Sequence, residues 1–221
     1  MVFALTCHNT LKMSSINRHP CSGVILAGGL NTRFTGRDKA LLEIGGKSIL
    51  SRILEVFRAV FDEIILVSNN PQQHLKQDLH IVTDLIQVRS SLTGIHTGLF
   101  YSSNPYIFCS GCDTPFLKKD LVECVLERIK PGIDLLIPET SAGLEPLCAV
   151  YSKESLSAVE RKLLQNKCKI HKIFKQNRIR RIPEKALRIK DPDLISFLNI
   201  NTPEDLEKAR HFASKKKEIS A

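Results

Sequence analysis

The chain has 221 residues, of which 43% are hydrophobic and 25% charged, and its formal net charge is +9. This composition is typical of a globular protein and excludes a collagen-like or disordered chain, and the apolar stretches are far shorter than the ~20 residues of a membrane helix. The positive charge favours an anionic partner. With three Tyr and no Trp, the chain offers no aromatic platform for nucleic-acid bases, and a small polyphosphate explains the charge equally well.

Residues 1–20 show no sustained hydrophobic period, and we expect a disordered lead segment, with Met13 as an alternative start. Polar residues such as His8 and Lys12 interrupt the apolar core that a secretory peptide needs, so we expect no export. The seven cysteines should then stay reduced, and the expected location is the cytoplasm.

From residue 22 onward, strands and helices alternate. In chain order we predict a strand at 22–27, a helix at 47–61, strands at 63–68 and 81–83, a helix at 94–101, a strand at 106–109, a helix at 118–130, strands at 134–138 and 147–151, and a helix at 153–165. A terminal helix should begin at Thr202, which caps it, with Pro203 in the first turn and Asp205 closing a capping box. The pattern predicts an α/β fold with a mostly parallel central sheet covered on both faces. We expect a single domain over 21–212 and a basic tail over 213–221.

Polar or glycine residues follow each of the first four predicted strands. The first strand runs into Gly28-Gly29, the second into Asn69, the third into Asp84 and the fourth into Asp113. Ligands of such sheets bind beyond the carboxyl ends of the strands, so these residues should meet at one edge. Their chemistry suits a nucleotide with a metal ion.

The loop after the first strand combines glycine with positive charge. The backbones of Gly28 and Gly29 can approach a ligand closely, and Arg33, Arg37 and Lys39 add cations. We interpret this loop as a phosphate-binding loop. The alternative is a surface loop with scattered charge.

The carboxylates after the third and fourth strands each allow two interpretations. Asp113 can hold Mg²⁺, which takes few protein ligands and completes its shell with water and substrate phosphates. It can equally accept hydrogen bonds from its own turn before Pro115. Asp84 can accept from the N1–H and N2–H₂ donors of guanine and Asn69 can bind a ribose or base edge, or both can be ordinary loop residues.

Two local patterns do not carry the chemistry that they suggest. The run Gly46-Lys47-Ser48 resembles the end of a P-loop, but the first glycine of that motif falls on Leu41 and we expect no strand directly before it. We therefore predict a turn into the following helix. Cys109 and Cys112 have redox or zinc spacing without a second pair, which favours reduced thiols at a strand end.

Four motifs in order resemble the sugar-nucleotide-type nucleotidyltransferases and, within them, the molybdenum cofactor guanylyltransferases. They are Leu-Ala-Gly-Gly at 26–29 with Arg33 and Asp-Lys-Ala-Leu-Leu at 38–42, Cys-Asp-Thr-Pro-Phe-Leu at 112–117, Glu-Pro-Leu-Cys-Ala at 145–149, and Asn-Ile-Asn-Thr-Pro-Glu-Asp-Leu at 199–206. The resemblance spans residues 22 to about 210. It implies a three-layer, Rossmann-like nucleotidyltransferase fold.

The resemblance also implies a reaction: GMP is transferred from GTP to the molybdenum-bound molybdopterin cofactor, with Mg²⁺ and release of pyrophosphate. The implied partners are GTP, molybdopterin, and molybdoenzymes or other proteins of cofactor biosynthesis, with no nucleic acid or membrane. By position, the implied nucleotide-binding residues are Leu26, Ala27, Gly28, Gly29, Lys39, Asn69, Asp84 and Asp113, the catalytic ones Lys39, Asp113 and Arg33, and the metal ligands Asp113 and Asn201.

The residues leave other functions open. Residues 90–94 read Ser-Ser-Leu-Thr-Gly where the family has Gly-Pro-Leu-Ala-Gly, in a loop that helps to seat the base. The alternatives are a cytidylyl- or other nucleotidyltransferase acting on a pterin or sugar phosphate, and a non-catalytic GTP-binding protein that delivers cofactor.

Overall fold

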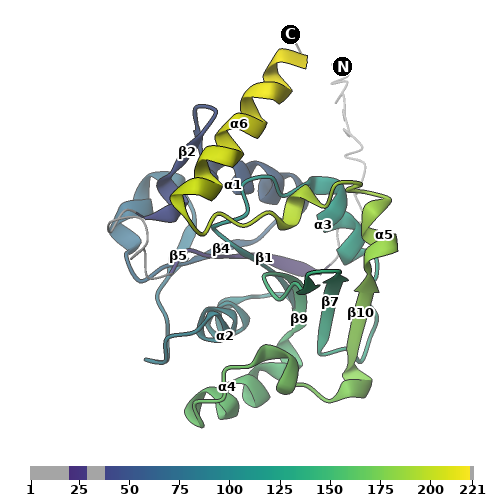
Figure 1. Cartoon of the computed structure of the whole chain (residues 1–221). Coiled ribbons are helices and arrows are strands. Elements are labelled where there is room, and N and C mark those ends of the chain that lie inside the picture. Colours follow the sequence, from purple (N-terminus) through teal and green to yellow (C-terminus); the bar gives the residue numbers. More distant parts are fainter. Residues whose placement is uncertain (1–19, 29–37, 220–221) are drawn as a thin grey trace, which may run out of the picture.

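The protein folds into three layers, with a central sheet between two layers of helices (Figure 1). The computed structural model describes residues 20–28 and 38–219. The strands are β1 (Cys21–Leu26), β2 (Glu43–Ile44), β3 (Lys47–Ser48), β4 (Ile64–Val67), β5 (His80–Val82), β6 (Tyr106–Gly111), β7 (Leu135–Thr140), β8 (Gly143–Leu144), β9 (Cys148–Ser152) and β10 (Ile179–Pro183). The α-helices are α1 (Ile49–Val60), α2 (Ser91–Tyr101), α3 (Lys119–Leu126), α4 (Leu156–Leu164), α5 (Glu184–Arg188) and α6 (Pro203–Ile219).

The sheet has the strand order β10-β7-β9-β6-β1-β4-β5, with β8 paired to β7. β1 lies between β4 and β6 and is parallel to both, and β10 is parallel to β7. β9 is antiparallel to both of its neighbours, β6 and β7. The prediction of an α/β fold with a mostly parallel sheet is therefore confirmed. The carboxyl ends of β1, β4, β5 and β6 lie side by side at one edge.

Helices cover both faces of the sheet, as expected. α1 and α3 pack with one face in a core cluster that includes Ile53, Phe57 and Val122. α2 and α4 pack on the other face in a second cluster that includes Val24, Leu99 and Val159. Figure 1 shows the two layers above and below the sheet. The central strand β1 contributes residues to both clusters, because a parallel central strand is buried on both sides.

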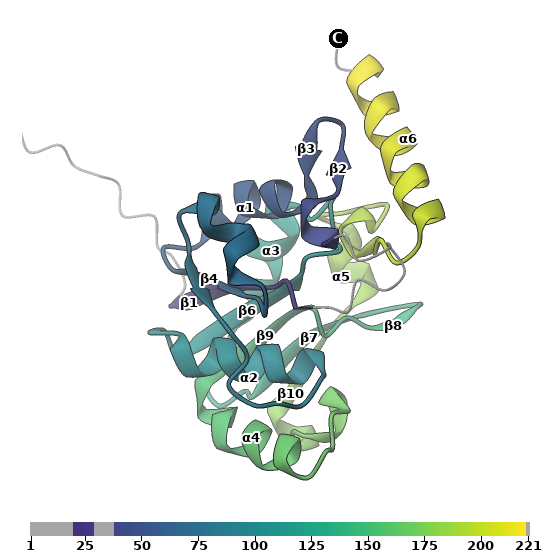
Figure 2. The same ribbon diagram turned by 90° about the vertical axis from the view of Figure 1, so that its left-hand side faces the viewer.

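The helix predicted for 47–61 begins two residues later, because a short hairpin comes before it. Glu43–Ile44 pairs antiparallel with Lys47–Ser48 across Gly45 and Gly46, whose φ angles are 59° and 83°. Glycine adopts such positive angles without strain. No strand leads into residue 41, where a P-loop would begin, because Lys39–Leu41 is a 3₁₀ helix, as expected. The predicted turn into α1 is also confirmed: Ser48 caps the helix by accepting from the Ser51 amide at 3.1 Å. Figure 2 shows the hairpin beside α6.

Other element boundaries also differ from the prediction. α2 begins at Ser91 rather than 94 because Ser90 caps it, α3 ends at Leu126 rather than 130, and the helix predicted for 153–165 is a 3₁₀ turn at Lys153–Ser155 followed by α4. β8, β10 and α5 were not predicted. β10 is a sheet edge with two exposed arginines, so its sequence lacks the continuous apolar run of a central parallel strand.

The terminal helix α6 has the predicted capping box. The Asp205 amide donates to Thr202 Oγ1 at 3.2 Å, and Asp205 Oδ2 accepts from the Thr202 amide at 2.9 Å. α6 continues to Ile219, so the boundary that we predicted at 212/213 falls inside this helix.

The predicted lead segment up to residue 19 lies outside the described residues. Among the described residues, the cysteines are free thiols and no helix has the length and apolarity that crossing a membrane requires.

Candidate nucleotide-binding site

A cavity of about 560 Å³ lies at the edge where β1, β4 and β6 end. Its lining is mixed, with glycines, two cations, two carboxylates and a few apolar side chains: Leu26, Ala27, Gly28, Lys39, Val67, Asn69, Asn70, Asp84, Arg89, Ser90, Ser91, Gly94, Gly111, Cys112, Asp113 and Leu147. The structure therefore brings together the residues that the sequence placed after four different strands. Of the predicted site residues, Gly29 and Arg33 lie outside the described residues.

Backbone hydrogen bonds between neighbouring strand ends hold the floor of the cavity. The Ala27 amide donates to the Val67 carbonyl at 2.8 Å, and the Cys112 amide donates to the Leu26 carbonyl at 3.0 Å. The chain therefore leaves β1 between the ends of β4 and β6. A Cβ added to Gly28 would lie 3.7 Å from Asn69 Nδ2. The segment that follows β1 is therefore close to the segment that follows β4.

Lys39 enters the cavity from a 3₁₀ helix, Lys39–Leu41, that follows the first loop. Its Nζ donates to Asn201 Oδ1 at 3.1 Å. Asn201, predicted as a metal ligand, thus directs its side-chain oxygen at Lys39, and it is not among the residues that line the cavity. Lys39 also acts on Asp113, because its charge lowers the pKa of that carboxyl.

Asp113 is half-buried, and its Oδ1 is shut off from solvent without a hydrogen-bond partner among the described residues. Burial raises the pKa of the carboxyl above its ordinary value, while Lys39 and its own backbone amide act in the opposite direction. Gly111 makes room for this carboxylate, since a Cβ there would lie 2.5 Å from Asp113 Oδ1. The Asp113 carbonyl accepts from the Ile200 amide at 2.8 Å, which ties this loop to the segment that carries Asn201.

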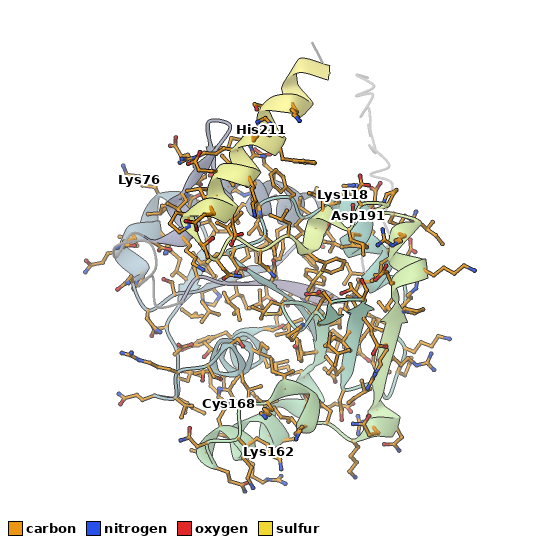
Figure 3. All side chains as sticks on the ribbon, in the orientation of Figure 1. Lys76, Lys118, Lys162, Cys168, Asp191 and His211 are labelled. Carbon is orange, nitrogen blue, oxygen red and sulfur yellow. The ribbon has the colours of Figure 1, made fainter. Side chains whose placement is uncertain are left out.

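An ion pair with a buried aspartate fixes the chain that follows Asp113. Lys118 Nζ lies 2.6 Å from Asp191 Oδ1, and the Ser196 amide donates to Asp191 Oδ2 at 2.8 Å (Figure 3). Burial would raise the pKa of Asp191, but the hydrogen bonds from Lys118 and Ser196 outweigh it and the pKa is lowered. The loop between β6 and α3 is therefore anchored to the C-terminal part of the chain.

Asn69 and Asp84 form a reciprocal pair on the opposite side of the cavity. Asn69 Nδ2 donates to Asp84 Oδ2 at 2.8 Å, and the Asp84 amide donates to Asn69 Oδ1 at 3.3 Å. This leaves Asp84 Oδ1 buried without a partner among the described residues. The pair presents a carboxylate oxygen of fixed orientation to a ligand that carries N–H donors.

The N-terminus of α2 supplies Ser90 and Ser91, which the family resemblance placed in a base-seating loop, and Arg89, which was not assigned from the sequence. Arg89, Ser90 and Ser91 line the cavity, and Ser90 Oγ caps the helix by accepting from the Leu92 amide at 3.0 Å. A serine pair before an apolar helix was the available signal, but the predicted start at residue 94 placed these residues in a loop. The positive end of α2 and the Arg89 guanidinium both favour a negatively charged ligand.

The donor set fits a magnesium ion that shares its coordination with a nucleotide. No group of three or more His, Cys, Asp or Glu among the described residues could hold a metal on its own. Mg²⁺ does not need such a cage, because it commonly binds through one or two carboxylates and substrate phosphates. The unpartnered Asp113 Oδ1 is a suitable carboxylate oxygen.

Comparison with known proteins shows the family to which the chain is similar. The model of the MobA-like NTP transferase domain matches residues 23–181. The chain is 44% identical over 188 residues to the molybdenum cofactor guanylyltransferase of Desulfosudis oleivorans, covering 85% of this chain and 93% of that protein. It is 38% identical over 199 residues to a probable molybdenum cofactor guanylyltransferase of Natranaerobius thermophilus, covering 88% and 97%.

A solved structure is similar over nearly the same length. The molybdopterin-guanine dinucleotide biosynthesis protein A of Archaeoglobus fulgidus superposes with a TM-score of 0.76 at 31% identity, covering 88% of this chain and 99% of that one.

Proposed function

Because this chain belongs to the family of MobA-like NTP transferase domains, we propose that it is a molybdenum cofactor guanylyltransferase. It transfers GMP from GTP to the molybdenum-bound molybdopterin cofactor and releases pyrophosphate. Relatives that cover most of the chain carry this name, and the sequence motifs resemble the same family. We propose that it works in the cytoplasm, where its thiols stay reduced.

One observation carries the assignment of the site. A single cavity has Lys39 and Asp113 on one side and the Asn69–Asp84 pair on the other. Cationic and carboxylate groups suit a triphosphate with its metal, and a buried acceptor suits the N1–H and N2–H₂ donors of guanine. The two sets of groups therefore bind opposite ends of one GTP molecule in this proposal.

In the proposed reaction, the terminal phosphate oxygen of the pterin attacks the α-phosphorus of GTP in line with the bond that breaks. A new phosphorus–oxygen bond forms, and the bond to the bridging oxygen of the β-phosphate breaks and releases pyrophosphate. The chain contributes mainly positioning and charge stabilisation. Leu26, Ala27 and the amides of Gly28 and Gly29 hold the phosphates, and Lys39 and Arg33 offset their charge.

Asp113 would hold Mg²⁺ through the oxygen that has no partner among the described residues. An ion held there would supply positive charge to polarise the α-phosphate and to neutralise the leaving pyrophosphate. Asn201 keeps Lys39 directed along the same side of the cavity through the hydrogen bond to Nζ.

Pyrophosphate release, measured with GTP, CTP, UTP and ATP in the presence of molybdopterin and Mg²⁺, tests the function. Of the four nucleotides, we expect only GTP to give pyrophosphate release. GTP should also raise the melting temperature of the protein, because it binds the native state. Lys39→Met should lower turnover by about 10²- to 10³-fold, by analogy with the loss of one charge-stabilising contact.

Lys162→Met is the matched control. It removes the same charge as Lys39→Met, but from helix α4, whose residues do not line the cavity (Figure 3). Release with CTP instead of GTP would favour the cytidylyl alternative. Binding of GTP without release of pyrophosphate would favour a delivery protein.

A further inference from the structure

A buried Asp–His pair lies directly behind the candidate site. His74 Nε2 approaches Asp38 Oδ2 within 3.2 Å, and the side chains are only 0% and 5% exposed. Asp38 immediately precedes Lys39, and His74 lies in the 3₁₀ helix Pro71–Gln77, which begins directly after Asn69-Asn70. Neither residue lines the cavity.

The two oxygens of Asp38 serve two different segments. Oδ1 accepts from the Ala40 amide at 3.0 Å and so caps the 3₁₀ helix that begins with Lys39. Oδ2 faces His74. The carboxylate therefore joins the segment that delivers Lys39 to the segment that follows β4.

The pair adjoins the cavity through the chain itself. Lys39, the residue after Asp38, lines the cavity, and Asn69 and Asn70, just before the helix of His74, line it as well. A shift of the Asp38 backbone would therefore move Lys39.

A buried carboxylate is costly unless it is hydrogen-bonded or paired. If an apolar side chain replaces His74, Asp38 Oδ2 loses its polar neighbour at 3.2 Å, which favours rotation of the carboxylate toward solvent and away from the Ala40 amide. Lys39 is attached to the same turn of backbone. Displacement of a catalytic group by about 1 Å can cost roughly 10²-fold in rate.

From this geometry we propose that His74 is a positioning residue, which acts through Asp38 to hold Lys39 in its productive place. The proposal rests on the proposed function, in which Lys39 offsets charge on the nucleotide phosphates. His74 itself touches no substrate.

The first test needs no activity. In His74→Phe, the backbone amides of residues 38–42 should exchange hydrogen roughly tenfold faster than in the wild type, because the cap that protects them opens more often. The amides of α1 should keep their exchange rates. His74→Gln retains a side-chain N–H donor and should restore slow exchange at residues 38–42. Unchanged exchange there in His74→Phe would overturn the proposal.

The second test is a double-mutant cycle on pyrophosphate release from GTP. His74→Phe should lower kcat/KM by roughly 10- to 100-fold per folded molecule. In the Lys39→Met background, the same substitution should cost little more, because the group that it positions is already gone. Multiplication of the two losses would show that His74 does not act through Lys39 and would overturn the proposal.

His96→Phe is the matched control, because His96 is a buried histidine on α2 that does not line the cavity. It should leave exchange at residues 38–42 and kcat/KM near wild-type values.

If His74→Phe does not fold, Asp38→Asn replaces it in both tests, since asparagine keeps an oxygen for the Ala40 amide and weakens only the contact with His74. A wild-type protein that releases no pyrophosphate would overturn the proposed function, while the exchange experiment would still decide the role of the pair.

Discussion

The burial of the Asp113 carboxylate costs folding free energy. Its Oδ1 is buried without a partner among the described residues, and burial raises the pKa of the carboxyl. Gly111 has no side chain to occupy the space that this oxygen takes. A charge kept in such surroundings is typical of a functional group, because burial costs free energy that the fold itself does not require.

We predict that Asp113→Asn separates stability from activity. Asparagine has nearly the same volume and no charge, so the free energy of unfolding at neutral pH should be unchanged or higher. Turnover should fall by about 10²- to 10³-fold, because a carboxylate ligand for the metal is lost. Urea denaturation and pyrophosphate release on the same preparation check both parts. Asp120→Asn, on the exposed side of α3, is the control. Near-normal turnover would argue against the metal role.

At the scale of single residues, the sequence predicted the chemistry of the site better than its contacts. Asn69, Asp84 and Asp113 were predicted because each follows a strand, and parallel strands end at one edge. Arg89 was not assigned, and Ser90 and Ser91 were singled out only through the family resemblance, because their place depends on where α2 crosses the sheet. The approach of His74 to Asp38 could not be predicted, since Asp38 belongs to a motif but His74, 36 residues further along the chain, belongs to none.

At the scale of elements, α2 packs closely on β1 because it has glycine at the contact. A Cβ on Gly98 would lie 2.7 Å from Val24 Cγ1, and one on Gly94 would lie 2.9 Å from Leu26 Cδ2. Val24 is fully buried and β-branched, so it has little freedom to move, whereas the end of the Leu26 side chain can rotate. The N-terminus of α2, with Ser90 and Ser91, therefore reaches the cavity through this close contact.

We predict that Gly98→Ala destabilises the protein. Alanine gains about 1 kcal/mol of helix propensity, but overpacking against Val24 costs about 1–3 kcal/mol, so the net loss should be up to about 2 kcal/mol. Chemical denaturation measures the loss. Gly94→Ala, which meets the flexible end of Leu26, should cost less. The double variant Val24→Ala/Gly98→Ala should be more stable than the sum of the single losses implies, and strict additivity would show that the contact is not the cause.

At the scale of the whole molecule, a polar network closes the edge of the sheet opposite the cavity. Glu63 accepts hydrogen bonds from Ser22 Oγ and from the Ser103 amide, the latter at 3.0 Å, and Asn104 Nδ2 donates to Ser22 Oγ at 3.0 Å. These residues lie where β1, β4 and β6 begin. Burial would raise the pKa of Glu63, but the hydrogen bonds from Ser22, Ser103 and Asn104 outweigh it and the pKa is lowered from 4.5.

We predict that Glu63 contributes to the acid limb of the stability curve. Because its folded pKa is lowered, the unfolded chain takes up the proton first, so its contribution is present above pH 4.5 and is lost as the pH falls through the folded pKa. Glu63→Gln should therefore lower stability at neutral pH and reduce the loss below about pH 4.5. Urea denaturation across this range measures the slope. Glu127→Gln, an exposed glutamate, is the control. An identical acid slope in Glu63→Gln would contradict the prediction.

The sequence by itself determined the alternation of strands and helices, the residues that follow each strand and the motifs of the family. These depend on local periodicity and on chemistry that is visible within a few residues. Only the tertiary structure decided that β6 rather than β5 lies next to β1, that β9 runs against its neighbours, and that α2 brings Arg89 to the cavity. Strand order and side-chain contacts between distant segments result from packing over the whole core, and no local propensity encodes that packing.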